Sequence, residues 1–481
     1  MELSEIIEQR RAKLAALKEK GIAAYASRKL TLTDIGVLLS DFQEAKKASI
    51  AGRLMALRSH GKAVFADLRD RTGKIQLYFK ADYIGQEKFE LLKNLDIADI
   101  IEVQGELFKT HTGEFTLKVE DFSLLSKSLR PLPEKWHGLK DVEVRYRQRY
   151  LDLIANEEVR KVFLLRSRII KAIREFLDKE GFLEVETPMM HSIAGGAAGR
   201  PFKTFHNEYG MDLYLRIAPE LYLKRLLVAG LEKVYEINRS FRNEGVSTRH
   251  NPEFTMLEVY SAYANYEDMM KLTQDLISFL CKEVLGTAKL VYQGNPIDLA
   301  LPWQKRSFAE MVKLKFDIEP QDDAGVMLNK LKAKGLAVDK NRLSRSQINK
   351  IIEEILEQDM SVSPTFVTDY FTHLCPLAQT KKDNPFVSER FELYVAGMEI
   401  ANAYSELNDP LEQRKRFEEE VAEAGPAEKK NVDEDYCLAL EHGMPPAGGL
   451  GIGIDRLVML LADQPSIRDV ILFPLLRPEQ P

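Results

Sequence analysis

The segment 240–260 constrains the fold most, because two strand-like runs flank a charged and flexible tip. Gly245 and Ser247 lie in the tip, which carries Arg242, Glu244, Arg249 and His250 on and beside it. Side chains in a strand point to alternate faces, so the even-numbered residues of the second run share one face. They are Phe254, Met256, Glu258 and Tyr260. The segment therefore predicts an antiparallel hairpin with an aromatic ring, a carboxylate and a phenol on the same face.

A second segment, Gly448–Arg456, combines glycines with an arginine. Glycines allow a backbone to approach closely, and arginine offers a bidentate fork to phosphate oxygens. Because Arg242 offers the same fork at the hairpin, the two segments together predict a nucleotide site on antiparallel strands. A surface hairpin with ordinary ion pairs is the alternative for segment 240–260 alone. Walker-type phosphate binding is excluded, since no Gly-Lys-Ser or Gly-Lys-Thr follows a glycine-rich loop.

Segment 397–409 supplies two further carboxylates. Asn402, Tyr404 and Glu406 alternate and share a face, whereas Glu399 falls on the opposite face of a regular strand. A bulge or bend between Glu399 and Asn402 is therefore needed for both glutamates to act together. Two carboxylates near a triphosphate are a usual protein share of a magnesium site, although a solvated strand edge would show the same spacing.

The N-terminal part of the chain has a different period. Residues 49–126 contain five short alternating runs, with a helical stretch near 85–95 between the third and the fourth. This is the element order of an OB barrel, a fold that stacks the bases of single-stranded nucleic acid on aromatic side chains. Residues 1–48 predict a basic helical extension, either a solvated helix or a helix that contacts a phosphate backbone.

Composition limits the remaining classes of protein. The 68 basic and 74 acidic residues give a net charge of −6, so any nucleic acid must meet local basic patches. The three cysteines form no Cys-x-x-Cys pair, which argues against disulfides and structural zinc and favours a reducing cytoplasm. No run approaches 18 apolar residues and the N-terminus carries no export signal, so we expect no membrane span.

The rest of the chain predicts a second, mixed domain. A linker at 127–150 contains prolines and a basic run, and a larger domain follows at 151–481. Strand-like runs at 211–217, 233–243, 252–263 and 390–406 predict an antiparallel sheet, and the polar stretch at about 307–360 predicts a helical insertion. The fold class is α+β, with an N-terminal OB-fold β-barrel and a central antiparallel sheet flanked by helices.

Three segments resemble the motifs of the class II aminoacyl-tRNA synthetases. Gly181–Pro188 is similar to the first motif, Phe241–Phe254 to the second and Gly449–Arg456 to the third. Each motif is degenerate alone, but their order behind an OB barrel resembles the bacterial lysine-specific branch over nearly the whole chain. The resemblance implies an anticodon-binding barrel and a class II catalytic domain. It also implies a cytoplasmic homodimer that activates L-lysine with ATP and transfers it to tRNA(Lys).

The resemblance also implies roles at the nucleotide. Arg242 and Arg456 are the expected catalytic residues on the phosphates, Phe254 stacks on adenine, and Glu399 and Glu406 hold Mg2+. The expected ATP contacts are Arg242, Glu244, His250, Asn251, Phe254, Glu399 and Arg456.

The amino-acid pocket is expected to be acidic. Glu220, Glu258 and Glu406 are carboxylates, and we see no basic residue on these faces, so a guest with two ammonium groups fits better than aspartate. Glu220 could equally serve as an N-terminal helix residue. By resemblance the lysine contacts are Gly196, Glu220, Arg242, Glu258, Tyr260, Asn402, Tyr404 and Glu406. The chain departs from the family pattern at Gly199 and Phe205, in a loop where we expect no change of specificity.

The resemblance places anticodon recognition on the barrel, at Arg58, Phe65, Gln76 and Glu114. Phe65 could instead belong to the barrel core. Two rival functions fit part of the pattern. A class II paralogue that lysylates a protein would lack the module at 49–126, and a non-enzymatic binding protein would not keep Arg242, Glu399, Glu406 and Arg456.

Overall fold

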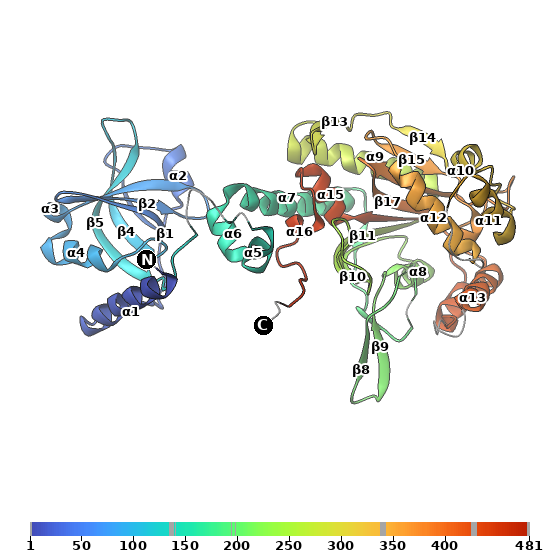
Figure 1. The fold of residues 1–481 in the computed structure, drawn as a ribbon, viewed down its shortest axis with the longest axis horizontal. Coiled ribbons are helices and arrows are strands. Elements are labelled where there is room, and N and C mark those ends of the chain that lie inside the picture. Colours follow the sequence, from blue (N-terminus) through green and yellow to red (C-terminus); the bar gives the residue numbers. More distant parts are fainter. Residues whose placement is uncertain are drawn as a thin grey trace. The chain divides into compact units, whose positions relative to one another are not determined.

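The computed structural model describes residues 2–133, 139, 141–193, 195–197, 199–336, 343–424 and 431–478. The chain divides into two compact units, Met1–Lys140 and Asp141–Pro481 (Figure 1). None of the helices in the described ranges has the length and apolar character that crossing a membrane requires.

The first unit is built on a closed five-stranded barrel, which confirms the predicted OB fold. The strand order is β1-β2-β3-β5-β4, and the parallel pair β3·β5 closes the barrel. Alternation explains the interior, since Ile75, Leu77 and Phe79 on β3 are all buried and share one face. The strands are β1 (Lys47–His60), β2 (Ala63–Arg69), β3 (Lys74–Lys80), β4 (Ile100–Lys109) and β5 (Phe115–Ser126), and the helical turns between β3 and β4 are α3 (Ala81–Ile84), α4 (Gln86–Leu91) and η1 (Leu92–Asn94).

Helices α1 (Leu3–Glu19) and α2 (Ile35–Ser40) pack on this barrel. Leu17, Ile35 and Leu38 belong to the barrel's own hydrophobic core. The segment predicted as a basic extension is therefore an integral part of the first unit.

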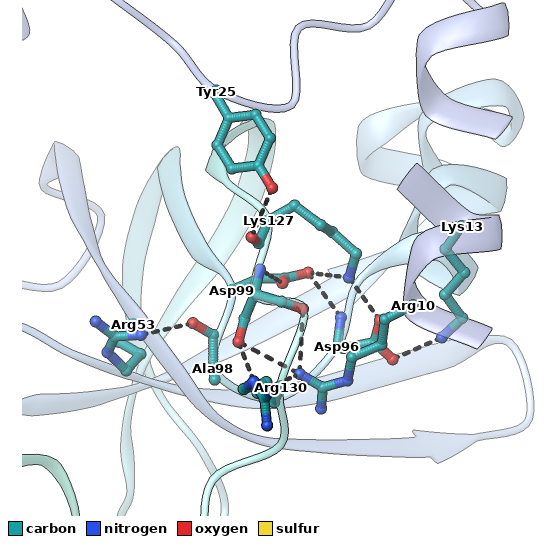
Figure 2. Close-up of polar contacts among 10 residues, drawn as sticks. Arg10, Lys13, Tyr25, Arg53, Asp96, Ala98, Asp99, Lys127 and Arg130 are labelled. Carbon is teal, nitrogen blue, oxygen red and sulfur yellow. Dashed lines mark hydrogen bonds and ion pairs between the residues drawn. The ribbon is translucent and has the colours of Figure 1, made fainter. Parts of the chain in front are cut away.

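A buried polar network fixes α1 to the end of β5 (Figure 2). The Lys127 ammonium is fully buried and lies 2.5 Å from Asp96 and 2.8 Å from Asp99. Lys13 of α1 binds Asp96 at 2.6 Å, and Arg10 donates to the carbonyl of Arg130 at 2.9 Å. Two of the basic side chains of α1 thus bind the barrel unit itself, while Arg11, Lys18 and Lys20 are exposed.

The second unit contains an eight-stranded sheet of order β14-β15-β16-β17-β18-β11-β10-β6. The six strands from β15 to β10 pair antiparallel, as predicted, and only the two edge strands pair parallel. The strands are β6 (Leu183–Glu184), β10 (Lys233–Phe241), β11 (Glu253–Ala262), β14 (Gln304–Ser307), β15 (Thr365–Thr368), β16 (Arg390–Val395), β17 (Met398–Ser405) and β18 (Ala447–Gly453).

Helices α7 (Glu157–Lys179), α9 (Tyr266–Leu280) and α15 (Ile454–Leu461) contribute to the main core with this sheet. Ile169, Ile173 and Leu177 recur at helical spacing on one face of α7 and are fully buried. The other elements are α8 (Glu220–Val228), η2 (Cys281–Leu285), η3 (Thr372–Leu374), α13 (Pro410–Ala424), α14 (Glu434–Glu441), α16 (Ile467–Val470), the sheet β7 (Met190–His191), β8 (Lys203–His206) and β9 (Met211–Leu215), and the hairpin β12 (Lys289–Tyr292) and β13 (Asn295–Asp298).

Two parts of this unit differ from the sequence expectation. The single strand expected at 390–406 is the hairpin β16–β17, which turns at Ala396 and Gly397 with φ of 52° and 66°. Residues 141–150, expected as linker, form α5 (Val142–Arg147) and the start of α6 (Arg149–Ala155). Residues 134–138 and 140 of that linker lie outside the described residues.

The predicted insertion contains α10 (Phe308–Phe316), α11 (Ala324–Ala333) and α12 (Arg345–Gln358), and its residues 337–342 lie outside the described ranges. These helices share a separate hydrophobic core with β15 and β16.

Candidate active site

The predicted hairpin is β10–β11, and its register places Glu258 opposite Glu236 and Tyr260 opposite Val234. The Tyr260 hydroxyl donates to Glu258 at 3.2 Å, so the two side chains lie on one face as predicted. Both are buried in the centre of the sheet, because β18 pairs on the other side of β11.

The bulge that the sequence required is present in β17. Leu393 pairs with Ala401, but the next residue, Tyr394, pairs with Glu399, so Ile400 is the extra residue. The bulge reverses the alternation between Glu399 and Asn402, which is the reversal that the sequence required.

Three buried carboxylates meet at this sheet. Glu220 at the start of α8, Glu258 on β11 and Glu406 at the end of β17 are 7%, 5% and 1% exposed. The Tyr404 hydroxyl donates to Glu220. Gly196, with φ of 87°, lies so close that a β-carbon there would be 3.4 Å from Cβ of Glu220. The structure thus brings together six of the eight residues predicted for the amino acid: Gly196, Glu220, Glu258, Tyr260, Tyr404 and Glu406. Asn402 instead accepts from Nε of Arg390 on β16 at 3.2 Å.

Burial controls the charge of this pocket. Burial and the nearby Glu220 raise the pKa of Glu258 to about 8. Burial also raises the pKa of Glu406 well above its usual range, although Lys224 opposes this. A bound cation would therefore stabilise the ionised form of these carboxyl groups.

Sequence reasoning missed Lys224, and the expectation of a pocket without a basic residue is wrong. Its fully buried ammonium lies 2.6 Å from Glu220 and also contacts Glu406. The four-residue spacing between Glu220 and Lys224 on one helix could have revealed the pair.

Gly449 on β18 was also missed. A β-carbon at this position would lie 1.8 Å from Oε1 of Glu406 and 2.6 Å from the Tyr260 ring. Only a glycine therefore leaves room for both side chains.

Arg242 follows strand β10 and lies beside the ring of Phe254, with its guanidinium carbon 5.1 Å from the ring centroid. Its Nε is buried and has no hydrogen-bond partner among the described residues. Gly199 lies against it, because a β-carbon there would be 3.1 Å from Cδ of Arg242. A buried donor without a partner suits an anionic ligand.

Arg456 connects the third motif to the loop of the second. It donates to Oε2 of Glu399 at 3.0 Å and contacts Nε2 of His250 at 3.0 Å. Glu244 and His250 are exposed in the loop, whereas Asn251 is buried and donates to the carbonyl of Glu253 at 2.6 Å. The expected ATP contacts thus surround one end of the sheet.

The structure does not support a single magnesium ion between Glu399 and Glu406. They lie at opposite ends of β17, roughly 20 Å apart at about 3.3 Å per residue. Magnesium binds oxygens at about 2.1 Å, so one ion does not reach both carboxylates. Glu406 forms an ion pair with Lys224. Glu399 instead lies near Glu392 on β16. Burial raises the pKa of Glu392, Arg390 opposes this rise, and the charge of Glu399 adds to it.

On the barrel, the predicted anticodon residues lie on adjacent strands. Arg58 pairs with Phe65 across β1 and β2, and Gln76 on β3 accepts from Thr116 at 3.0 Å. Phe65 is half-buried and outside the barrel core, which decides against the core alternative. Tyr78, which sequence reasoning missed, lies beside it with ring centroids 5.0 Å apart. Glu114 is exposed in the turn before β5.

Comparison with known proteins agrees with this geometry. Residues 141–477 match the family described as tRNA synthetases class II (D, K and N), and residues 48–125 match the OB-fold nucleic acid binding domain.

Similar proteins cover the whole chain. A lysine–tRNA ligase of Pelotomaculum thermopropionicum is 55% identical over 100% of this chain and 96% of its own. One from Carboxydothermus hydrogenoformans is 55% identical over 99% of both chains, and one from Moorella thermoacetica is 53% identical over 99% of both. The chain therefore belongs to the class II tRNA synthetases of the D, K and N group.

Proposed function

We propose that this protein is a lysine–tRNA ligase, which activates L-lysine with ATP and transfers it to tRNA(Lys). One observation carries the choice of amino acid: three buried carboxylates meet at this site, and among the described residues Lys224 is the one ammonium in contact with them. The formal balance at the pocket is −2 when the carboxyl groups are ionised. A lysine molecule brings two ammonium groups, so it matches this balance.

The same charge balance disfavours aspartate as the substrate. Its side-chain carboxylate would meet Glu258 and Glu406 without a free cation, and burying like charges together costs several kcal/mol. The carboxylate of lysine instead has Arg242, whose buried Nε is free to donate.

The first step needs position and charge rather than a proton transfer. A carboxylate oxygen of lysine attacks the α-phosphorus of ATP in line, and the bond from that phosphorus to the leaving pyrophosphate breaks. Arg242 faces the charge that develops on the transferring phosphorus. Arg456 exchanges Glu399 and His250 for phosphate oxygens. Phe254 offers its ring to adenine.

The second step is attack of the terminal ribose hydroxyl of the tRNA on the lysyl-adenylate carbonyl. We assign no general base to it.

Magnesium fits the acidic side of the nucleotide site. We propose that Glu399 holds Mg2+ together with Glu392, which replaces Glu406 in the assignment made from the sequence. When bound, Mg2+ would supply positive charge opposite the phosphates. The half-buried position of Glu399 beside Arg456 supports this choice.

The remaining proposals concern tRNA, assembly and location. We propose that the barrel binds the anticodon through Phe65, Gln76, Arg58 and Glu114, supported by the adjacent, half-buried rings of Phe65 and Tyr78. We propose a homodimer through Gly181–Pro188, whose Leu183 is exposed. A cytoplasmic location is supported by three free, buried cysteines.

ATP–pyrophosphate exchange with each of the twenty amino acids tests the function. We expect exchange with lysine alone, and lysine-dependent charging of tRNA(Lys). Silence with every amino acid would exclude the enzyme, and exchange with aspartate would refute the charge argument.

A further inference from the structure

Lys224 is a buried cation at the site that we propose for lysine, which is itself a cationic substrate. It lies one helical turn after Glu220 on α8, and its side chain is fully buried. Its ammonium binds Oε1 of Glu220 at 2.6 Å and contacts Oε2 of Glu406, and it lies 5.3 Å from the ring centroid of Tyr404. One side chain thus joins a carboxylate from α8 to another from the end of β17.

The charge of Lys224 is maintained by its surroundings. Burial alone would lower its pKa, but the fields of Glu220 and Glu406 outweigh burial and hold the pKa above its usual range. Tyr436 on α14 also faces it, and its phenol is neutral because burial raises its pKa. Lys224 therefore stays protonated over the whole working range of pH.

The carboxylates need this cation. The like charge of Glu220 favours protonation of both Glu258 and Glu406. The phenols of Tyr260 and Tyr404 add no charge, because burial raises both their pKa values. Without Lys224, Glu406 would lose the cation that opposes the rise of its pKa, and a protonated carboxyl group has lost its attraction for an ammonium.

The contacts also fix orientation. Lys224 holds one oxygen of Glu220 and one of Glu406, which leaves a second oxygen on each side chain. Neither oxygen of Glu406 has a hydrogen-bond partner other than this ion pair among the described residues. Such an oxygen is available to the ammonium of a ligand.

We propose that Lys224 is a positioning residue for lysine recognition, whose ion pairs favour the charged form of Glu406 and turn one oxygen of Glu220 and one of Glu406 toward the substrate. This inference rests on the proposed lysine specificity. Lys224 acts through the two carboxylates and does not touch the reacting atoms.

The test is the pH dependence of lysine-dependent ATP–pyrophosphate exchange between pH 6.5 and 9. Lys224→Gln keeps a hydrogen-bond donor and removes the charge. We expect its KM for lysine to rise about 10- to 100-fold at pH 7, the size of a charged hydrogen bond. The KM should recover as pH rises and the carboxyl groups ionise, while the KM for ATP changes less than about twofold. Lys224→Arg should keep the pH profile of the unchanged protein.

Arg225→Met is the matched control. It removes a cation from the same helix, one residue away, where Arg225 binds Asp433 at 2.9 Å outside the pocket. We expect the lysine KM of this variant to follow the unchanged protein at every pH. A profile of Lys224→Gln that runs parallel to that of the unchanged protein, or equal losses for lysine and ATP, would refute the inference.

Thermal unfolding provides a second readout that does not need activity. In Lys224→Gln the pKa of Glu406 rises further above its unfolded value, so stability is lost progressively as pH increases. We expect the Tm difference from the unchanged protein to widen between pH 6 and 9. A constant difference, or a variant that is unfolded at every pH, would overturn the inference. Absence of lysine-dependent exchange in the unchanged protein would refute the proposed function instead.

Discussion

The two halves of the candidate site differ in how they hold charge. In the amino-acid half, Glu220, Glu258 and Glu406 are nearly inaccessible and come from the start of α8, from β11 and from the residue directly after β17. In the nucleotide half, residues 243–250 are all exposed on one loop. The first half is fixed before any ligand arrives, because its side chains are packed and paired. The second half has charged groups that are paired with each other and can exchange partners.

This difference suggests a division of work. Buried charges discriminate between ligands, because a wrong guest leaves a desolvated group unpaired. Arg242 and Arg456 are proposed to bind the phosphates of ATP, which the activation of every amino acid uses, so these contacts need not distinguish one amino acid from another. We therefore expect changes in the amino-acid half to be severe and specific for lysine, and changes in the loop to be milder and specific for ATP.

Gly449→Ala should impair lysine activation more than any other variant proposed here. Its β-carbon would lie 1.8 Å from Glu406, so the carboxylate must move. A displacement of about 1 Å costs roughly 100-fold, and we expect at least that loss in kcat/KM for lysine.

Gly453→Ala on the same strand is the matched control. The nearest atom to its β-carbon would be 3.9 Å away, which is an ordinary contact, so lysine activation should stay nearly unchanged. Equal losses in the two variants would mean that the strand, and not the pocket, is sensitive.

Glu258→Gln should raise the KM for lysine about 10- to 100-fold, because a hydrogen bond to a charged group is lost, with little effect on ATP. Steady-state exchange with each substrate varied in turn measures this split. Comparable losses for both substrates would show that Glu258 serves the whole site.

The same variant has an effect on stability that depends on pH. Glu258 has a folded pKa of about 8, above its unfolded value of 4.5, so its protonated form contributes stability that is lost as pH rises between those values. The loss is up to about 1.4 kcal/mol per pH unit. Without lysine, Glu258→Gln should therefore gain stability relative to the unchanged protein as pH rises to 8. Denaturant unfolding at pH 5 and pH 8 tests the sign.

The sequence predicted the parts of the site that depend on local pattern. Alternation placed Glu258 and Tyr260 on one face, and the mismatch between Glu399 and Asn402 required the bulge at Ile400. The turn at Ala396 was not predicted, because a positive φ is unusual for alanine and carries no sequence signal.

Features that depend on tertiary contact escaped prediction. Lys224 reads as an ordinary surface lysine of an amphipathic helix until Glu406, far along the chain, is brought beside it. The pairing of Glu399 with Glu406 failed for a different, local reason: at about 3.3 Å per residue, β17 holds the two glutamates too far apart for one metal ion.

Phe65→Ala should affect neither the amino-acid half nor the nucleotide half of the active site, because Phe65 lies on the barrel. Loss of one stacking contact is worth about 1 to 3 kcal/mol, so we expect the KM for tRNA to rise about 10-fold. ATP–pyrophosphate exchange should not change, because it needs no tRNA. An unchanged tRNA KM would remove Phe65 from the anticodon site.

His250→Ala should have the smallest effect of these variants, and it tests the nucleotide half of the site. Nε2 of His250 contacts Arg456 at 3.0 Å, and its Nδ1 lies 2.9 Å from the hydroxyl of Ser247, so the imidazole links the loop to the third motif. Arg456 keeps its contact with Glu399 when the imidazole is removed, so it remains near its position. Loss of one exposed hydrogen bond is worth about 1 kcal/mol, and we expect the KM for ATP to rise about fivefold with the KM for lysine unchanged. A lysine KM that rose as much as the ATP KM would mean that the loop also shapes the amino-acid pocket, and the division between the two halves would fail.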